Sequence, residues 1–254
     1  MTQLTKIFFY GEPRWIKKEG GKFYLLDGEN PSEGLSSDKL VSVKSDKDFN
    51  FVNFFWGKNV FGLAYNYKSL VGKREKYEEP LIFLKSFNST CPSKTKITIP
   101  SGFDKVWVEV ELVIVIGRKC RNVSPEEAHN YVFGYTIGSD VTAQNICSRD
   151  HHLARSKALD NFAPVGPCIV TDLNTSDLCL ETRINGELFQ SGRTSDRILN
   201  DAESVSLLSQ YYTLEPGDLI FTGTPAGAMN SLVKPGCSVI HNIEKIGKLC
   251  FSII

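Results

Sequence analysis

The sequence predicts a β-dominated α+β protein. Many short segments are rich in β-branched, aromatic and other apolar residues and are bounded by turn residues, only two helices are evident, and few helices separate the strands. Repeated βαβ units are therefore not indicated, and the chain has no internal repeat or low-complexity tract. The expected strands are residues 6–10, 23–26, 106–116, 133–140, 168–171, 178–184, 219–221, 238–243 and 248–253.

The N-terminal part of the chain is expected to form a small unit of its own. Its short strands alternate with the turn signals Gly20-Gly21 and Asp27-Gly28. Residues 30–48 are polar and contain a Pro-Ser-Glu-Gly turn, whereas the sequence from Phe51 onward is more apolar. We therefore predict a small β-rich N-terminal domain over residues 1–55 and a main domain over residues 56–254.

The two expected helices have distinct signals. The first begins at Ser124 in a capping box with proline at the first helical position, and Gly134 is expected to end it. The second covers residues 201–213, where apolar residues recur at helical spacing. Between two expected strands, Asn185-Gly186 is a strong hairpin signal.

Composition and charge exclude several classes of partner. The 254 residues include 29 Lys plus Arg and 29 Asp plus Glu, so the formal net charge is zero. Nucleic acids and anionic membranes need a basic surface, so neither is an expected partner. The seven cysteines are never spaced as C-x-x-C, and neither a signal peptide nor a membrane span is evident. We expect a cytoplasmic globular protein.

The segment 106–116 carries the first chemical signal. Side chains alternate between the two faces of a strand, so Glu109 and Glu111 share one face, about 7 Å apart along the strand. The other face is wholly apolar and must be buried. Two like charges on a half-buried face repel and lose solvation, and a divalent cation such as Mg²⁺, Mn²⁺ or Ca²⁺ would relieve both effects. The alternative is that both carboxylates occupy the solvated end of a strand.

Three further features favour the same chemistry. Asp140 ends the expected strand 133–140 and would provide a third carboxylate, although an aspartate there is also typical of a turn or helix cap. Lys157 would neutralise a carboxylate or move protons, or else be a solvated surface lysine. The Thr-Gly-Thr-Pro turn at 222–225 offers donors to an anion, or is simply a tight turn after a strand.

Several motifs occur in one order along the chain, and together they resemble the fumarylacetoacetate hydrolase family nearly from end to end. The segments that carry the resemblance are YGEPRW at 10–15, GLAYNY at 62–67, EPLIFLK at 79–85, VELVIVIG at 110–117, GY at 134–135 with DVTA at 140–143, NGEL at 185–188 and TGTP at 222–225. This resemblance implies a mixed β-roll catalytic domain of the fumarylacetoacetate hydrolase type, commonly dimeric. It also implies small 2-oxo or 1,3-dicarbonyl acid substrates and a metal that acts as a Lewis acid on an enolate.

The resemblance assigns roles position by position. Glu109, Glu111 and Asp140 match the three carboxylates that hold Mg²⁺, Mn²⁺ or Ca²⁺, and Lys157 matches the catalytic lysine beside the metal. Two further residues are implied in substrate binding. Thr224 matches the threonine that contacts the substrate carboxylate, and Lys85 matches a lysine at the end of the opening strand.

The chain also departs from the family pattern. The family's lid carries a histidine and a glutamate that activate water, and the matching positions here are Leu70 and Lys73. Gln144 and Cys147 stand where the family has an arginine and a glutamine that contact substrate, so Gln144 becomes a candidate substrate-binding residue. No partner base for Cys147 is identifiable from spacing. The residues after the TGTP turn, 226–229, are altered as well.

His151 and His152 lie between Asp140 and Lys157, on a segment that could fold over the pocket. One of them would then act as an acid or base. The alternative is that both face solvent.

These residues lead to one hypothesis and one alternative. The hypothesis is a divalent-metal enzyme, expected to be a homodimer, that acts on a small oxo or diketo acid through a metal-stabilised enolate. Isomerisation or tautomerisation is favoured over C–C hydrolysis, because enolisation needs no activated water; decarboxylation is the third family reaction. The alternative is a catalytically altered member that binds a metal or ligand.

Overall fold

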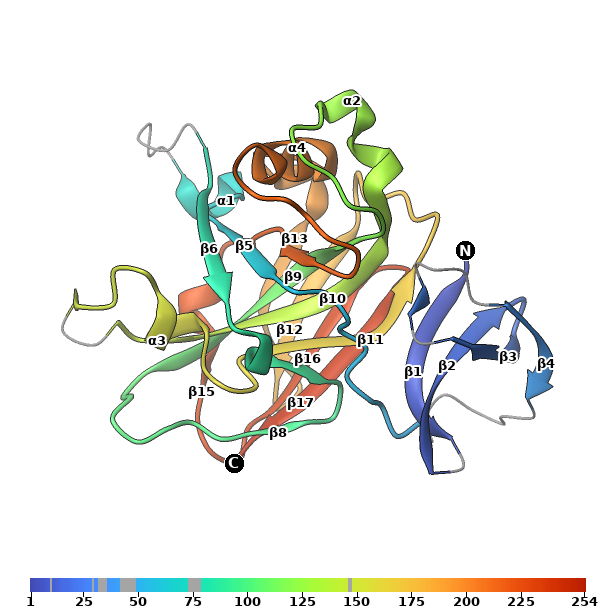
Figure 1. The fold of residues 1–254 in the computed structure, drawn as a ribbon. Helices are drawn as coiled ribbons and strands as arrows, with labels where there is room; N and C mark the ends of the chain where they lie inside the picture. Colours follow the sequence, from blue (N-terminus) through green and yellow to red (C-terminus); the bar gives the residue numbers. More distant parts are fainter. Residues whose placement is uncertain (10, 29, 32–35, 42–48, 73–78, 146–147) are drawn as a thin grey trace.

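The computed structural model describes residues 1–254 except 10, 29, 32–35, 42–48, 73–78 and 146–147. Within the described part, twelve strands form one large mixed sheet (Figure 1). Its main path runs β4 (Ser36–Val41), β3 (Lys22–Asp27), β2 (Glu12–Glu19), β1 (Gln3–Phe9), β11 (Ala163–Val170), β10 (Val132–Ala143), β9 (Val106–Ile116), β14 (Leu219–Phe221), β5 (Val60–Ala64) and β6 (Leu81–Lys85). Two short strands lie off this path: β15 (Leu232–Val233) pairs with β9, and β7 (Thr90–Pro92) pairs with β11.

A second sheet of five strands packs against the centre of the first. Its order is β13 (Glu187–Arg193), β12 (Cys179–Ile184), β16 (Ser238–Ile243), β17 (Gly247–Ile253) and β8 (Lys96–Ile97). The β12–β13 hairpin turns at Asn185 and Gly186, whose φ angles of 51° and 89° are those of a type I′ turn. The predicted strand-dominated α+β fold is confirmed.

The helices are short and lie outside the sheets. They are α1 (Lys68–Val71), α2 (Pro125–Ala128), α3 (Ala154–Lys157) and α4 (Asp201–Tyr211), with single 3₁₀ turns at Phe87–Ser89, His129–Tyr131, Thr194–Asp196 and Ala228–Asn230. The helix expected at 201–213 is confirmed as α4. The helix expected to reach Gly134 is shorter, because Val132 already pairs with Ile116 of β9 and begins a strand. Its capping box at Ser124 is present.

Strands β9 and β10 form the centre of the molecule. Val108, Val110 and Leu112 are fully buried and pack with residues of β12, β16 and β17 between the two sheets. On the opposite face, Val113 and Val115 pack in a second cluster that also contains Trp15. Both faces of this strand pair are covered around Val113 and Val115. The pair therefore forms a rigid platform for the side chains at its outer end, where Glu109 and Asp140 lie.

The N-terminal strands extend the large sheet at one edge (Figure 1). Gln3 and Leu4 of β1 pair with Val170 and Ile169 of β11. Strand β2 was not among the expected strands, because its many charged residues hide its pairing with β1 and β3. The division into residues 1–55 and 56–254 stays a prediction.

No helix in the described part of the chain has both the length and the apolar character that crossing a membrane requires.

Candidate metal and active site

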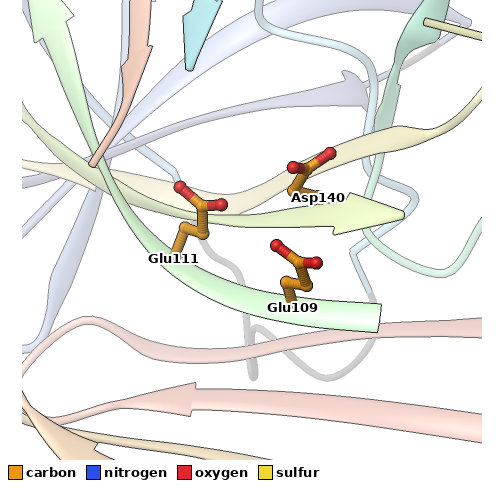
Figure 2. A group of neighbouring side chains, drawn as sticks. All are labelled: Glu109, Glu111 and Asp140. Carbon is orange, nitrogen blue, oxygen red and sulfur yellow. The ribbon is translucent and has the colours of Figure 1, made fainter. Parts of the chain in front are cut away.

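Three carboxylates meet at the outer end of the β9–β10 pair. Asp140 stands directly opposite Glu109 in the antiparallel register, and Glu111 stands opposite Gly138. Figure 2 shows all three side chains pointing to the same side of the two strands. One oxygen of each lies within 4.8 Å of the others. The alternation predicted for residues 106–116 therefore holds, and the two strands bring the third carboxylate to the first two.

Asp140 does not end its strand, which corrects the expected boundary. Strand β10 continues to Ala143, because Val141, Thr142 and Ala143 still pair with β9. Asp140 is thus an internal strand residue, fully buried, and neither a turn residue nor a helix cap. The paired backbone on both sides holds its carboxylate in one direction.

Gly138 leaves room beside Glu111. A Cβ atom at this position would lie 2.4 Å from Cε1 of Phe221 and 2.6 Å from Cγ2 of Val113, so no other residue fits without displacing them. Phe221 of β14 is fully buried. Its ring therefore packs against Gly138.

Two lysines share the carboxylate of Asp140. Lys85 Nζ donates to Oδ1 at 2.5 Å, and Lys157 Nζ donates to Oδ2. Lys157 also donates to Thr142 Oγ1 at 2.8 Å and lies 3.6 Å from Glu109 Oε2. Three carboxylates and two ammonium groups carry a formal charge of about −1 when all are ionised. The cluster as it stands is short of positive charge.

The two lysines differ in access. Lys157 comes from the last position of α3 and lines the cavity above the carboxylates, whereas Lys85, at the end of β6, has a fully buried side chain and is not among the lining residues. Burial lowers the pKa of Lys85. Burial also acts to lower the pKa of Lys157, but attraction to Asp140 and Glu109 is stronger and raises it. Lys157 is therefore held as an ammonium group at the cavity wall.

The acids respond unequally to this environment. Burial, and next the nearby charges of Asp140 and Glu109, hold the pKa of Glu111 well above its usual range. Burial also raises the pKa of Glu109, although Lys157 opposes it. For Asp140 burial is outweighed by the two lysines, so its pKa is lowered. Two of the three anions are thus destabilised by their neighbours and by burial, and a hard divalent cation fits this set of oxygen donors.

Residues around the carboxylates hold them in place. Trp107 Nε1 donates to Glu109 Oε1 at 2.6 Å, and the Gly223 N–H donates to Glu111 Oε2 at 2.6 Å. Trp107 and Thr142 are cross-strand partners two residues from Glu109 and Asp140, so both lie on the same face. Neither residue was predicted as part of the site, although the two-residue period of the strands places them beside the acids.

The TGTP turn is fixed from several sides. The Thr224 hydroxyl donates to the Val110 carbonyl at 2.9 Å and accepts from Gln190 Nε2 at 3.0 Å. Asn66 Nδ2 donates to the Thr222 carbonyl at 2.9 Å. Gly223 has φ +88° and a Cβ there would lie 2.8 Å from the Leu63 carbonyl oxygen, so glycine is required. The turn is a rigid wall of the site.

A cavity of about 470 Å³ opens above the carboxylates. Lys157, Gly223 and Thr224 also line it. The rest of its wall is largely apolar and includes Leu70, Leu81, Phe83, Trp107, Leu153 and Met229. The volume is within the range of small-molecule sites.

The remaining predicted residues are distributed as follows. His151 and His152 are both exposed; His151 also lines the cavity, and His152 is not among the lining residues. Gln144 is exposed, donates its backbone N–H to the Lys105 carbonyl at 2.8 Å and is not among the lining residues, so its substrate-binding role stays a prediction. The remaining positions of interest, Lys73 and Cys147, lie outside the described residues.

Comparison with known proteins identifies relatives of this chain. Residues 57–254 match the family described as Fumarylacetoacetate (FAA) hydrolase C-terminal. An uncharacterised protein of Methanocaldococcus jannaschii is 42% identical over 92% of this chain and 95% of its own length. The structure of 2-hydroxyhepta-2,4-diene-1,7-dioate isomerase from Mycobacterium marinum is 32% identical, with a TM-score of 0.89, covering 100% of this chain and 98% of that one.

A second solved structure bears on the metal. Fumarylpyruvate hydrolase from Pseudomonas aeruginosa, in complex with Mn²⁺ and pyruvate, is 28% identical with a TM-score of 0.72 and covers 83% of this chain and 93% of that one. The solved relatives named here are thus an isomerase and a hydrolase. The family match, the fold and the acidic cluster agree, and the chain belongs to the fumarylacetoacetate hydrolase family.

Proposed function

We propose that this protein is a divalent-metal-dependent enzyme that acts on a small 2-oxo or 1,3-dicarbonyl acid through its enolate. The observation that carries the proposal is the convergence of Glu109, Glu111 and Asp140, within 4.8 Å, at the floor of a cavity. These three residues would hold one Mg²⁺ or Mn²⁺ ion, with Ca²⁺ as the third candidate. The relative crystallised with Mn²⁺ and pyruvate supports this choice of metal and substrate class.

The bound metal would act as a Lewis acid toward the oxygens of a chelating oxo acid. The chain's own residues then have distinct tasks. Lys157 keeps Asp140 and Glu109 oriented and presents an ammonium group to the cavity. The fixed turn at Thr224 forms the wall against which a carboxylate would rest. The apolar lining limits water in the site, which strengthens every charge interaction inside it.

Isomerisation or tautomerisation is the reaction that the site favours. Leu70 stands where the family's lid histidine is expected, and it lines the cavity. An aliphatic side chain cannot activate water. Enolisation requires only that a proton leave one carbon and return to another atom. Decarboxylation likewise needs no attacking water, whereas C–C hydrolysis does.

The test is an assay of enol–keto exchange of oxaloacetate, and of cleavage of acylpyruvates, with and without Mg²⁺ or Mn²⁺. We expect metal-dependent exchange, slower cleavage, and loss of both in Glu109→Ala. Equal rates without metal, or equal metal binding by Glu109→Ala, would overturn the proposal. Glu181→Ala is the control, because it removes a strand carboxylate that does not line the cavity and should leave exchange and metal binding unchanged.

The second candidate is a family member that binds a metal or ligand without turnover. Leu70 at the lid position and the exposed Gln144 favour it. Stoichiometric metal binding with no exchange and no cleavage of either substrate would establish this alternative. We also propose a homodimer, as the resemblance implies, and sedimentation velocity of the metal-loaded protein tests it.

A further inference from the structure

The segment between β10 and α3 contains a turn that is tied at both ends. The Leu153 N–H donates to the Asp150 carbonyl at 3.1 Å, which closes a turn with His151 and His152 at its two central positions. The Asp150 N–H donates to Asn145 Oδ1 at 2.9 Å, and Asp150 Oδ2 accepts the Ser156 N–H at 2.6 Å. The Asp150 side chain is thus a fixed anchor of the turn, although His151 and His152 are exposed.

The turn directs the two histidines differently. His151 lines the cavity that holds the three carboxylates, whereas His152 does not. The other two histidines of the chain are elsewhere: His129 bonds the Glu126 carbonyl on an exposed helix end, and His241 is buried between the sheets. All four histidines are described, and His151 is the one that lines the cavity.

The remaining titratable groups of the cavity already have partners. Lys157 is held by Asp140 and Thr142, and the Asp150 carboxylate is held by the Ser156 N–H. The three carboxylates are the proposed ligands of the cation. Within the described residues, His151 is the titratable lining residue whose side chain makes no hydrogen bond or ion pair.

We propose that His151 is the acid–base residue of the reaction, and this inference rests on the proposed function. A neutral imidazole nitrogen takes the proton from the carbon next to the substrate carbonyl. The electron pair of that C–H bond becomes the C=C bond of the enolate, and the carbonyl π pair moves onto the oxygen. The imidazolium then returns the proton to the substrate at its new position, so isomerisation needs no further reactant. A ring on an anchored turn would thus supply the proton transfer on carbon that isomerisation needs.

The first experiment compares His151→Ala with the matched variant His152→Ala, both loaded with Mn²⁺. General acid–base catalysis contributes about 100-fold or more, so we expect kcat of enol–keto exchange to fall by about 100-fold in His151→Ala and to stay within about threefold in His152→Ala. Added imidazole should restore part of the rate of His151→Ala alone. Both variants should bind Mn²⁺ as the wild type does, because neither residue is a carboxylate of the site.

A second measurement does not depend on turnover. Imidazole nuclear magnetic resonance signals of the Mg²⁺-loaded protein, assigned through the two variants, are followed during titration with oxalate, a planar mimic of an oxo-acid enolate. We expect the His151 signals to shift and those of His152 to stay in place. Unmoved His151 signals, or exchange within threefold of wild type in His151→Ala, overturn the His151 inference alone. A wild type that binds Mg²⁺ but catalyses no exchange overturns the proposed function, and the catalytic role of His151 with it.

Discussion

Two buried acidic sites on the large sheet have opposite surroundings. Asp218, in the turn before β14, is fully buried and accepts four N–H donors, from the backbone of Lys58, Asn59 and Glu215 and from the Asn59 side chain, at 2.8–3.0 Å. Glu111, on β9, is buried as well but accepts a hydrogen bond only from Gly223, among the described residues, and faces two other carboxylates.

The difference shows how a structural acid is distinguished from a site acid. Asp218 closes the turn before β14 and ties it to the segment before β5. Neutral donors surround both of its oxygens, so the group is complete without a ligand. Glu111 has one donor and is repelled by its neighbours, so its burial opposes folding, and the proposed cation would relieve this cost. Burial is common to both. The two acids differ in the number of their hydrogen-bond donors and in the charge of their neighbours.

The largest expected effect is on the structural acid. Asp218→Ala leaves four N–H donors without their acceptor beside a fully buried position, and we expect it to lower the free energy of unfolding by about 4 kcal/mol. Asp218→Asn keeps one acceptor oxygen and should lose about half as much. Urea unfolding of the metal-free protein measures both. A loss below about 1 kcal/mol for the alanine variant would contradict the structural role of this acid.

The second effect concerns Glu111, where one substitution should raise the stability of the metal-free protein and lower its affinity for metal. Glu111→Gln keeps an oxygen for the Gly223 N–H and removes one repelling charge, so we expect the metal-free protein to gain about 1 kcal/mol of stability. The same change should weaken Mn²⁺ binding about 100-fold, which corresponds to about 2.7 kcal/mol. Calorimetric titration and urea unfolding of one preparation give both values. A variant that is less stable and binds Mn²⁺ with unchanged affinity would show that Glu111, like Asp218, is a structural acid.

A buried histidine extends the comparison to pH. His241 on β16 bonds Ser139 Oγ at 2.8 Å and Thr182 Oγ1 at 3.0 Å, and burial lowers its pKa from 6.5 to about 3. Between pH 6.5 and about pH 3, His241 binds a proton in the unfolded chain but not in the folded chain. The free energy of unfolding therefore falls as the pH drops below 6.5. We expect about 2 kcal/mol to be lost at pH 5. Urea unfolding at pH 7.5 and 5 checks this, with His241→Gln as the variant in which this part of the loss should vanish.

The sequence was sufficient for the centre of this site and insufficient for its surroundings. The segment 106–116, rich in β-branched residues, predicts β9 with its observed bounds, and alternation along it predicts the common face of Glu109 and Glu111. The aspartate at 140 resembled a strand end, because only the register with β9 shows that pairing continues. The bond from Lys85 to Asp140 joins positions 55 residues apart, and no local pattern contains such a contact.

The smallest expected effect is at the cavity mouth, where apolar side chains, unlike those of the core, remain exposed. Leu81 is 45% and Met229 is 73% exposed, and both line the cavity. An apolar substrate tail would cover them, so Met229→Glu should lower kcat/KM for an acylpyruvate with a five-carbon tail by about tenfold and leave oxaloacetate within about twofold. Leu188→Glu is the matched control, since Leu188 is 50% exposed on β13 and does not line the cavity. Equal losses for both substrates would indicate that Met229 supports the fold of the mouth and does not contact the tail.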